Sequence, residues 1–191
     1  MNKYISILRG INVGGQKKIR MQDLQLLYEE LGLQDVMTYI QSGNVVFCSA
    51  MSDKSEIKAK LEAAIETAIE AKYGFQVPVM IRTAEEFSRA LNSMPFEGID
   101  LNTDGTKVLL TFLSDEPSEE SIAALQSFVK VPEQLQIDGK TVYLYCPNGY
   151  GKSKLSNTFI ENKLKVIATT RNLKTVTRLC ELANSPTGSN S

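Results

Sequence analysis

An order of expected secondary structure that occurs twice along the chain most constrains the fold. Apolar runs and glycine stops predict a strand, a helix, a two-stranded hairpin, a helix, a strand and a further helix over residues 4–91, and the same order recurs over residues 107–183. Strand, helix, two strands, helix and strand is the pattern of ferredoxin-like domains. We therefore expect an α+β fold with two ferredoxin-like subdomains in tandem, each of the form β-α-β-β-α-β plus helix.

Composition indicates where the two halves join. Residues 96–105 contain two glycines and several polar side chains, as linkers often do. We expect an N-terminal ferredoxin-like subdomain at residues 1–95, this linker at 96–105, and a C-terminal ferredoxin-like subdomain at 106–183. The last residues, 184–191, are small and polar, and we expect them to form a disordered tail.

Histidine is absent from the 191 residues, which narrows the possible chemistry. Ser-His and Cys-His catalytic pairs, an imidazole general base and imidazole metal ligands are excluded. The three cysteines lie far apart without metal-ligand spacing, and we expect them to be reduced, buried thiols. We therefore expect no metal and no cofactor, and the sequence assigns no catalytic residue.

The net charge of −1 hides a segregation of charge along the chain. Residues 1–20 contain five Lys and Arg residues and no acid, and residues 146–180 contain seven Lys and Arg residues and one Glu. Both stretches also contain glycine-rich loops. Backbone amides exposed by glycine, next to Lys and Arg, are typical of anion and phosphate sites. Solvated basic faces, with glycines in ordinary turns, are the alternative interpretation.

The first of these loops, RGINVGG, follows an expected strand and precedes an expected helix. It matches neither the GxGxxG pattern nor the Walker A spacing. Arg9 could hold a carboxylate or phosphate through two hydrogen bonds, Asn12 could present an amide, and Gly14 and Gly15 could expose backbone amides. Alternatively, the glycines only permit a positive φ in a tight crossover.

A second polar motif, QSGN, lies at the tip of the first expected hairpin. Ser-Gly-Asn in such a place is usual turn chemistry. Next to the first loop, however, Gln41, Ser42 and Asn44 would extend a polar cluster, and we include them among the candidate ligand-binding residues.

A third motif, GKSKL, has a Gly-Lys-Ser ending that imitates a phosphate-binding loop. The position of the first Walker glycine is occupied by Cys146, so we exclude a true P-loop. A simpler anion site remains, formed by Lys152, Ser153 and Lys154 at the start of a helix expected over residues 153–163.

The fourth motif, TTRN, lies between an expected strand and the last expected helix. Asn172 is a natural helix N-cap. Capping does not explain Arg171, because a cation is mildly unfavourable at a helix N-terminus unless an anion lies there. We include Thr170, Arg171, Asn172 and Thr175 among the candidate ligand-binding residues.

Together, RGINVGG, YIQSGNVVF, GKSKL and TTRN-x-x-TV resemble the bacterial family called domain of unknown function 1697, over residues 4–182. The resemblance implies an α+β fold of two ferredoxin-like subdomains and a bacterial cytosolic setting. It supplies no reaction and no catalytic residue. In the family, TTRN is commonly followed by an aromatic residue and Asn, where this chain has Leu173 and Lys174.

Our leading interpretation is a cytoplasmic binding protein. The four loops would converge, in a cleft between the two subdomains, on a phosphate-bearing ligand, either a small molecule such as a nucleotide or single-stranded nucleic acid. One alternative is an enzyme acting on a nucleotide or phosphorylated metabolite without histidine; another is an interaction module without a ligand. We expect no membrane span, and the oligomeric state stays open.

Overall fold

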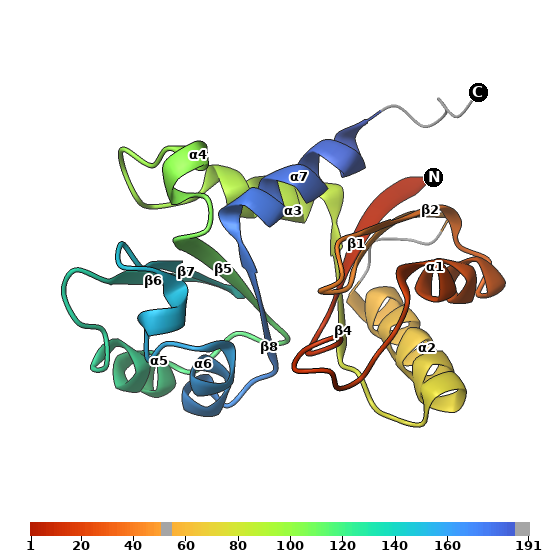
Figure 1. The fold of residues 1–191 in the computed structure, drawn as a ribbon, viewed down its shortest axis with the longest axis horizontal. Coiled ribbons are helices and arrows are strands. Elements are labelled where there is room, and N and C mark those ends of the chain that lie inside the picture. Colours follow the sequence, from red (N-terminus) through yellow and green to blue (C-terminus); the bar gives the residue numbers. More distant parts are fainter. Residues whose placement is uncertain (51–54, 186–191) are drawn as a thin grey trace. The chain divides into compact units, whose positions relative to one another are not determined.

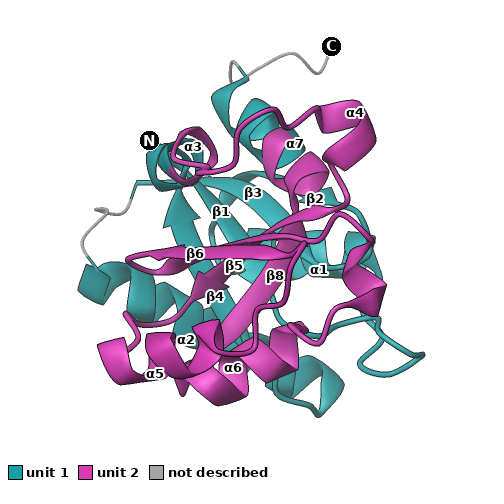
Figure 2. Ribbon diagram, turned by 90° about the vertical axis from the view of Figure 1, so that its left-hand side faces the viewer, with its two compact units in different colours: residues 1–89, 178–191 teal, residues 90–177 magenta. Residues whose placement is uncertain are grey.

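The structure, a computed structural model, describes residues 1–50 and 55–185. The chain divides into two compact units, which Figure 2 shows in different colours. Unit 1 comprises Met1–Arg89 together with Arg178–Ser191, and unit 2 comprises Ala90–Thr177. Both boundaries fall inside helices, α3 (Ala84–Asn92) and α7 (Leu173–Asn184).

Unit 1 contains a four-stranded sheet with strand order β2-β3-β1-β4, in which every neighbouring pair is antiparallel. The elements that precede α3 are β1 (Asn2–Leu8), α1 (Met21–Glu30), β2 (Gln34–Tyr39), β3 (Asn44–Ser49), α2 (Ser55–Tyr73) and β4 (Val79–Thr83). Helices α1 and α2 cover one face of this sheet (Figure 1). This is the arrangement of a ferredoxin-like domain.

The core of unit 1 lies between the sheet and these two helices. The rings of Tyr4 and Phe47 stack with centroids 5.7 Å apart, and Tyr28 of α1 meets Phe47 edge-on at 5.7 Å. The Tyr28 hydroxyl lies 2.8 Å from the Ser6 hydroxyl. Burial raises the pKa of Tyr28, so this hydroxyl stays protonated. The packing fixes β1 and α1, the two elements that flank the first glycine-rich loop.

Unit 2 repeats the topology, with an antiparallel sheet of strand order β6-β7-β5-β8. The elements between α3 and α7 are α4 (Leu101–Asp104), β5 (Val108–Leu113), α5 (Glu119–Gln126), β6 (Gln134–Asp138), β7 (Thr141–Tyr145), the 3-10 helix η1 (Tyr150–Lys152), α6 (Asn157–Leu164) and β8 (Ala168–Asn172). Helices α5 and α6 pack on one face of the sheet around Leu144, Ile160 and Leu164. The expected fold of two tandem ferredoxin-like halves is confirmed.

The two halves also share a hydrogen bond from an edge-strand backbone amide to a glutamate of a helix. Strands β4 and β8 lie at an edge, where backbone amides have no neighbouring strand. In unit 1, Glu66 Oε1 accepts from the amide of Val79 at 2.8 Å. In unit 2, Glu161 Oε2 accepts from the amide of Ala168 at 2.8 Å. In both units, therefore, a glutamate of the helix before the last strand, α2 or α6, accepts a hydrogen bond from the backbone amide of that strand's first residue.

The boundaries of the two compact units differ from those of the expected subdomains at 1–95 and 106–183. The expected subdomain boundaries stay a prediction. The expected linker contains α4, whose N-cap Asp100 accepts hydrogen bonds from the amides of Asn102 and Thr103. Most of the expected tail, residues 186–191, lies outside the described residues. Within the described part, the Ser185 hydroxyl donates to the carbonyl of Glu181 at 2.8 Å.

Candidate functional site

Asn12 holds the first glycine-rich loop in place. Its Oδ1 accepts from the amide of Ile19 at 2.9 Å, and its Nδ2 donates to the Ile19 carbonyl at 3.0 Å and to the Gln41 carbonyl at 2.8 Å. Asn12 has a φ of 55°, a conformation that Asn tolerates better than most residues. Because both polar groups of this side chain are engaged by backbone, Asn12 shapes the site rather than offering its amide to a ligand.

The QSGN turn packs directly onto that loop. Gly43 has a φ of 84°, and a Cβ at this position would lie 2.6 Å from Cδ1 of Ile11. The Gly43 carbonyl accepts from the amide of Leu8 at 2.9 Å. The buried Asn44 side chain donates to the Tyr39 carbonyl and to the Ser42 hydroxyl. The turn interpretation of this motif is therefore correct for these contacts.

The first loop, the QSGN turn and two helix ends enclose an open pocket of about 840 Å³ in unit 1. The predicted site residues Asn12, Gly15 and Gln41 line it. The other lining residues come from the end of the loop, the first turn of α1 and the last residue of α2; they are Lys18, Ile19, Arg20, Met21, Gln22, Asp23 and Tyr73. Lys18 and Arg20 belong to the basic stretch of residues 1–20, but no motif singled out any member of this second group.

Two cations and one acid set the charge of this pocket. Lys18 and Arg20 are exposed, and Arg20 donates through Nε to Oδ2 of Asp23 at 3.0 Å. The neighbouring Lys17 points its Nζ to the Gln76 carbonyl at 2.7 Å, so its ammonium has a backbone partner. Among the described residues, neither the Lys18 ammonium nor the terminal nitrogens of Arg20 have such a partner.

Helix α1 begins at the pocket without a side-chain cap. Arg20 is the N-cap residue, with φ −75° and ψ 139°, and its side chain accepts no hydrogen bond from the first turn. The first helical bond is donated by Leu24 to the Arg20 carbonyl at 3.0 Å. The amides of the three preceding residues therefore lack helical acceptors, as at every helix N-terminus.

Tyr73, at the end of α2, lines the pocket, and its hydroxyl oxygen is buried. Within the described part of the chain, this oxygen has no hydrogen-bond partner. Burial raises the pKa of Tyr73, Asp23 adds to the rise and Arg20 opposes it, so the phenol is a neutral donor at physiological pH. A buried polar atom without a partner is uncommon and costs stability unless something else satisfies it.

The remaining predicted residues of unit 1 lie outside this pocket lining. Arg9 is half-buried, and its backbone amide donates to the Pro78 carbonyl at 2.9 Å. Ser42 and Asn44 hold the turn, as described above. Gly14 is exposed, and a Cβ built on it would meet nothing within 4 Å. Of the first two motifs, the structure thus brings three residues to the pocket.

The helix expected over residues 153–163 begins later, at Asn157. The prediction that the third motif lies at a helix start is therefore wrong. Ser156 is the N-cap of α6 and accepts from the amide of Phe159 at 3.2 Å. Ser153 Oγ accepts from the amide of Leu155 at 3.0 Å in a local turn. Lys152 and Lys154 therefore do not stand at a helix start; they line a second pocket, of about 390 Å³, within unit 2.

The TTRN motif forms internal contacts of unit 2. The Thr170 hydroxyl lies 2.7 Å from that of Thr111 and donates to Oδ1 of Asn157 at 2.9 Å. Asn172 caps α7 by accepting from the amide of Thr175 at 2.9 Å, as expected. Arg171 donates through Nη1 to the Thr170 carbonyl, and burial lowers the pKa of its guanidinium to about 10.

Arg82 is the unit 1 counterpart of Arg171, and sequence reasoning missed it. Each arginine is the fourth residue of the last strand in its unit, β4 or β8. Each also donates to the backbone carbonyl of the preceding residue; Arg82 Nη1 donates to the Ile81 carbonyl at 3.0 Å. Thr83 caps α3: its hydroxyl accepts from the amide of Glu86, and the Glu86 carboxylate accepts from the amide of Thr83. Asn172 caps α7 in the corresponding place. Superposing the two halves of the sequence at the strand ends would have identified this pair.

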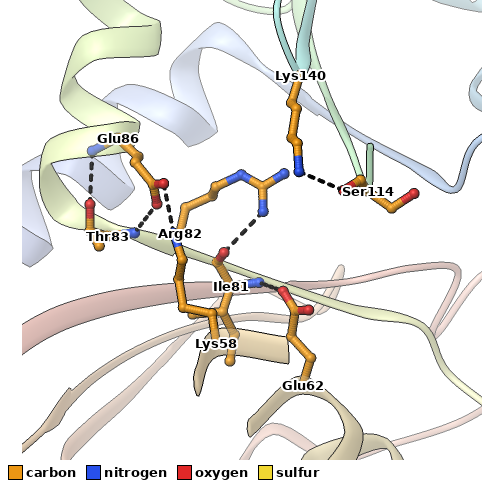
Figure 3. Close-up of polar contacts among 8 residues, drawn as sticks. All are labelled: Lys58, Glu62, Ile81, Arg82, Thr83, Glu86, Ser114 and Lys140. Carbon is orange, nitrogen blue, oxygen red and sulfur yellow. Dashed lines mark hydrogen bonds and ion pairs between the residues drawn. The ribbon is translucent and has the colours of Figure 1, made fainter. Parts of the chain in front are cut away.

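A charged cluster surrounds Arg82 within unit 1 (Figure 3). Glu86 pairs with the Lys58 ammonium at 2.7 Å, and Glu62 accepts from the amide of Ile81 at 2.7 Å. Burial raises the pKa of Glu62. For Glu86 burial also raises the pKa, but the hydrogen bonds from Lys58 and Thr83 outweigh it and hold this pKa below the ordinary value. Figure 3 also shows, in unit 2, Lys140 donating to the Ser114 carbonyl at 3.1 Å.

In residues 1–50 and 55–185, no three side chains of the types Cys, Asp and Glu lie together in a way that could hold a metal ion. The same residues contain no helix with the length and apolar character needed to cross a bilayer. The cysteines at 48, 146 and 180 are free and buried. The cytoplasmic location stays a prediction.

These features define an α+β protein with two ferredoxin-like halves and a polar pocket at the first glycine-rich loop. The chain belongs to the family described as "Protein of unknown function (DUF1697)", which matches residues 1–143. A similar solved structure is that of the conserved bacterial protein SP0830 from Streptococcus pneumoniae. It is 27% identical with a TM-score of 0.70, and the alignment covers 96% of this chain and 99% of that one. No curated protein matches the chain.

Proposed function

We propose that this chain binds a small phosphate-bearing ligand in the unit 1 pocket. The observation that carries the proposal is the donor set of that pocket. The uncapped N-terminus of α1 and the exposed Lys18 and Arg20 line one volume of about 840 Å³. A volume of this size suits a small molecule such as a nucleotide or a sugar phosphate.

The backbone supplies the first part of an anion site. At the start of α1, three amides without helical acceptors and the positive end of the helix dipole favour negative charge. Gly15 lines the same pocket with a φ of 76°, and no atom lies within 4 Å of a Cβ built there. A ligand oxygen can therefore approach the backbone of the loop closely.

The side chains add charge and neutral donors. Lys18 can place its ammonium on a phosphate, and Arg20 can use its terminal nitrogens while Nε stays on Asp23. Gln22 and Gln41 add uncharged groups that suit hydroxyl or base atoms. This mixture favours an organic phosphate over the inorganic ion alone.

The acid content favours binding over catalysis. The single carboxylate in the lining, that of Asp23, pairs with Arg20, so the described pocket offers no unpaired general base. The alternative of an interaction module without a ligand explains why Asn12, Gly43 and Asn44 hold the loops. It does not explain the exposed cationic donors of Lys18 and Arg20 beside them. The convergence of all four predicted loops on one shared ligand stays a prediction.

The direct test is calorimetric titration with adenosine monophosphate, ribose 5-phosphate and inorganic pyrophosphate, with adenosine as the uncharged comparison. We expect at least one phosphate compound to bind, adenosine to bind more weakly than its monophosphate, and Lys18→Gln to weaken binding about tenfold. Lys17→Gln is the matched control, because its ammonium already has the Gln76 carbonyl as partner. Equal losses in the two variants, or no binding of any phosphate compound, would reject the proposal.

A further inference from the structure

Unit 2 contains a separate basic pocket that the proposed function does not use. It has a volume of about 390 Å³ and lies where the chain after α5 meets the segment around η1. Three lysines line it, Lys130, Lys152 and Lys154, together with one acid, Glu133. Sequence reasoning selected two of these lysines as a phosphate site and missed Lys130, which is distant in sequence.

The three ammonium groups are available for a ligand. All three lysines are exposed, and within residues 1–50 and 55–185 none of them forms an ion pair or a side-chain hydrogen bond. Three cations around one small concave surface repel one another, and Glu133 can balance only one of them. An anion that bridges them would relieve this repulsion.

The same pocket has an apolar wall that an anion alone would not need. Phe128 is 38% exposed and Val131 is 96% exposed. The Phe128 ring meets Phe159 edge-on, with centroids 5.1 Å apart and an interplanar angle of 79°. The Lys163 ammonium lies 4.5 Å from the Phe128 centroid. The exposed ring is therefore held in one orientation by its neighbours rather than left free to move.

We propose that this pocket binds single-stranded nucleic acid, with a base against Phe128 and Val131 and the backbone phosphates on the three lysines. Aromatic or apolar contacts beside a positively charged groove are the usual means of binding single strands, since every base has an apolar face and every linkage a phosphate. A duplex fits less well because its bases are stacked inside the helix. The site is independent of the unit 1 pocket, and its residues are different.

The test is fluorescence anisotropy with a labelled oligothymidylate of about 15 nucleotides at about 50 mM salt, where phosphate contacts are strongest. The combined variant Lys130→Gln, Lys152→Gln and Lys154→Gln should bind at least about tenfold more weakly and depend less on salt. Phe128→Leu, which keeps an apolar side chain, should weaken binding about fivefold or more through lost stacking. Circular dichroism checks that each variant is folded.

One single variant serves as the matched control. Lys140→Gln removes an exposed lysine of unit 2 outside this pocket. It should bind the oligonucleotide as the unaltered chain does. The proposal is overturned if the oligonucleotide does not bind, if the triple variant binds it unchanged, or if an unlabelled duplex of equal length competes as well as the single strand.

Discussion

The side-chain amide of Asn12 donates to the backbone carbonyl of Gln41 at 2.8 Å, and this bond joins the first loop to the β2–β3 turn. The same side chain exchanges two hydrogen bonds with the backbone of Ile19, just before α1. One residue thus positions both loop walls of the unit 1 pocket. The pocket is therefore a built feature of the fold and not a gap between independent loops.

Removing this side chain should destabilise the protein. Asn12→Gly deletes all three hydrogen bonds while keeping a residue that tolerates the φ of 55°, and we expect the free energy of unfolding to fall by about 1–3 kcal/mol. Asn12→Ala should cost about 1 kcal/mol more, because alanine is strained at positive φ. Urea denaturation measures both. Equal stabilities of Asn12→Gly and the unaltered chain would contradict this role.

Two glycines with similar positive φ angles should respond differently to alanine. A Cβ on Gly43 would lie 2.6 Å from Cδ1 of Ile11, whereas one on Gly15 would meet nothing within 4 Å. Both substitutions carry the cost of positive φ, about 1 kcal/mol, and Gly43→Ala should lose about 1–3 kcal/mol in addition through overpacking. Thermal unfolding of the two variants compares these costs. A Gly15→Ala protein as unstable as Gly43→Ala would show that the contact with Ile11 does not matter.

Tyr73→Phe should raise stability. The substitution removes a buried hydroxyl without a partner among the described residues, so the free energy of unfolding should rise by about 1 kcal/mol. Urea denaturation of the variant and the unaltered chain measures the difference. A loss of stability would mean that the hydroxyl has a structural partner.

The two carboxylates near Arg82 should affect the pH dependence of stability in opposite directions. The folded pKa of Glu86 lies below its ordinary value of 4.5, so its contribution is present above that pH and is lost as pH falls through the folded pKa. The folded pKa of Glu62 lies above 4.5, so its contribution is present below that pH and is lost as pH rises through the folded pKa.

Urea midpoints measured between about pH 3 and pH 7 separate these contributions. Relative to the unaltered chain, Glu86→Gln should lose stability mainly above pH 4.5, the ordinary pKa of a Glu side chain, and little in acid. Glu62→Gln should remove the destabilisation that ionised Glu62 contributes as pH rises above the same value, so its urea midpoint should gain on that of the unaltered chain there. Parallel pH profiles for the two variants would contradict the assigned pKa directions.

The fold could be predicted from sequence because local signals agreed with one another. The order of apolar runs gave both sheets, and Asn172 was identified as the cap of α7. The start of α6 was misplaced because serine suits both a helix N-cap and a local turn. Ser153 forms a turn with the amide of Leu155, and Ser156 is the N-cap.

The pocket could be predicted only in part. Asn12, Gly15 and Gln41 were found because glycine and amide residues cluster at loops. Tyr73 was not, since it ends a helix of 19 residues and reaches the pocket only through tertiary packing. Lys130 was missed because it, too, reaches its pocket only through tertiary packing. The strands β6 and β7 separate it along the chain from Lys152 and Lys154.

An amide NMR titration of the isotope-labelled chain with inorganic pyrophosphate and adenosine monophosphate tests directly whether the start of α1 binds phosphate. We predict saturable shifts at the amides of Gly15, Met21, Gln22 and Asp23, which line the unit 1 pocket, and weaker binding in the Lys18→Gln variant. Absence of saturable shifts there, or shifts at these amides that are identical in Lys18→Gln, would contradict a phosphate site at the start of α1.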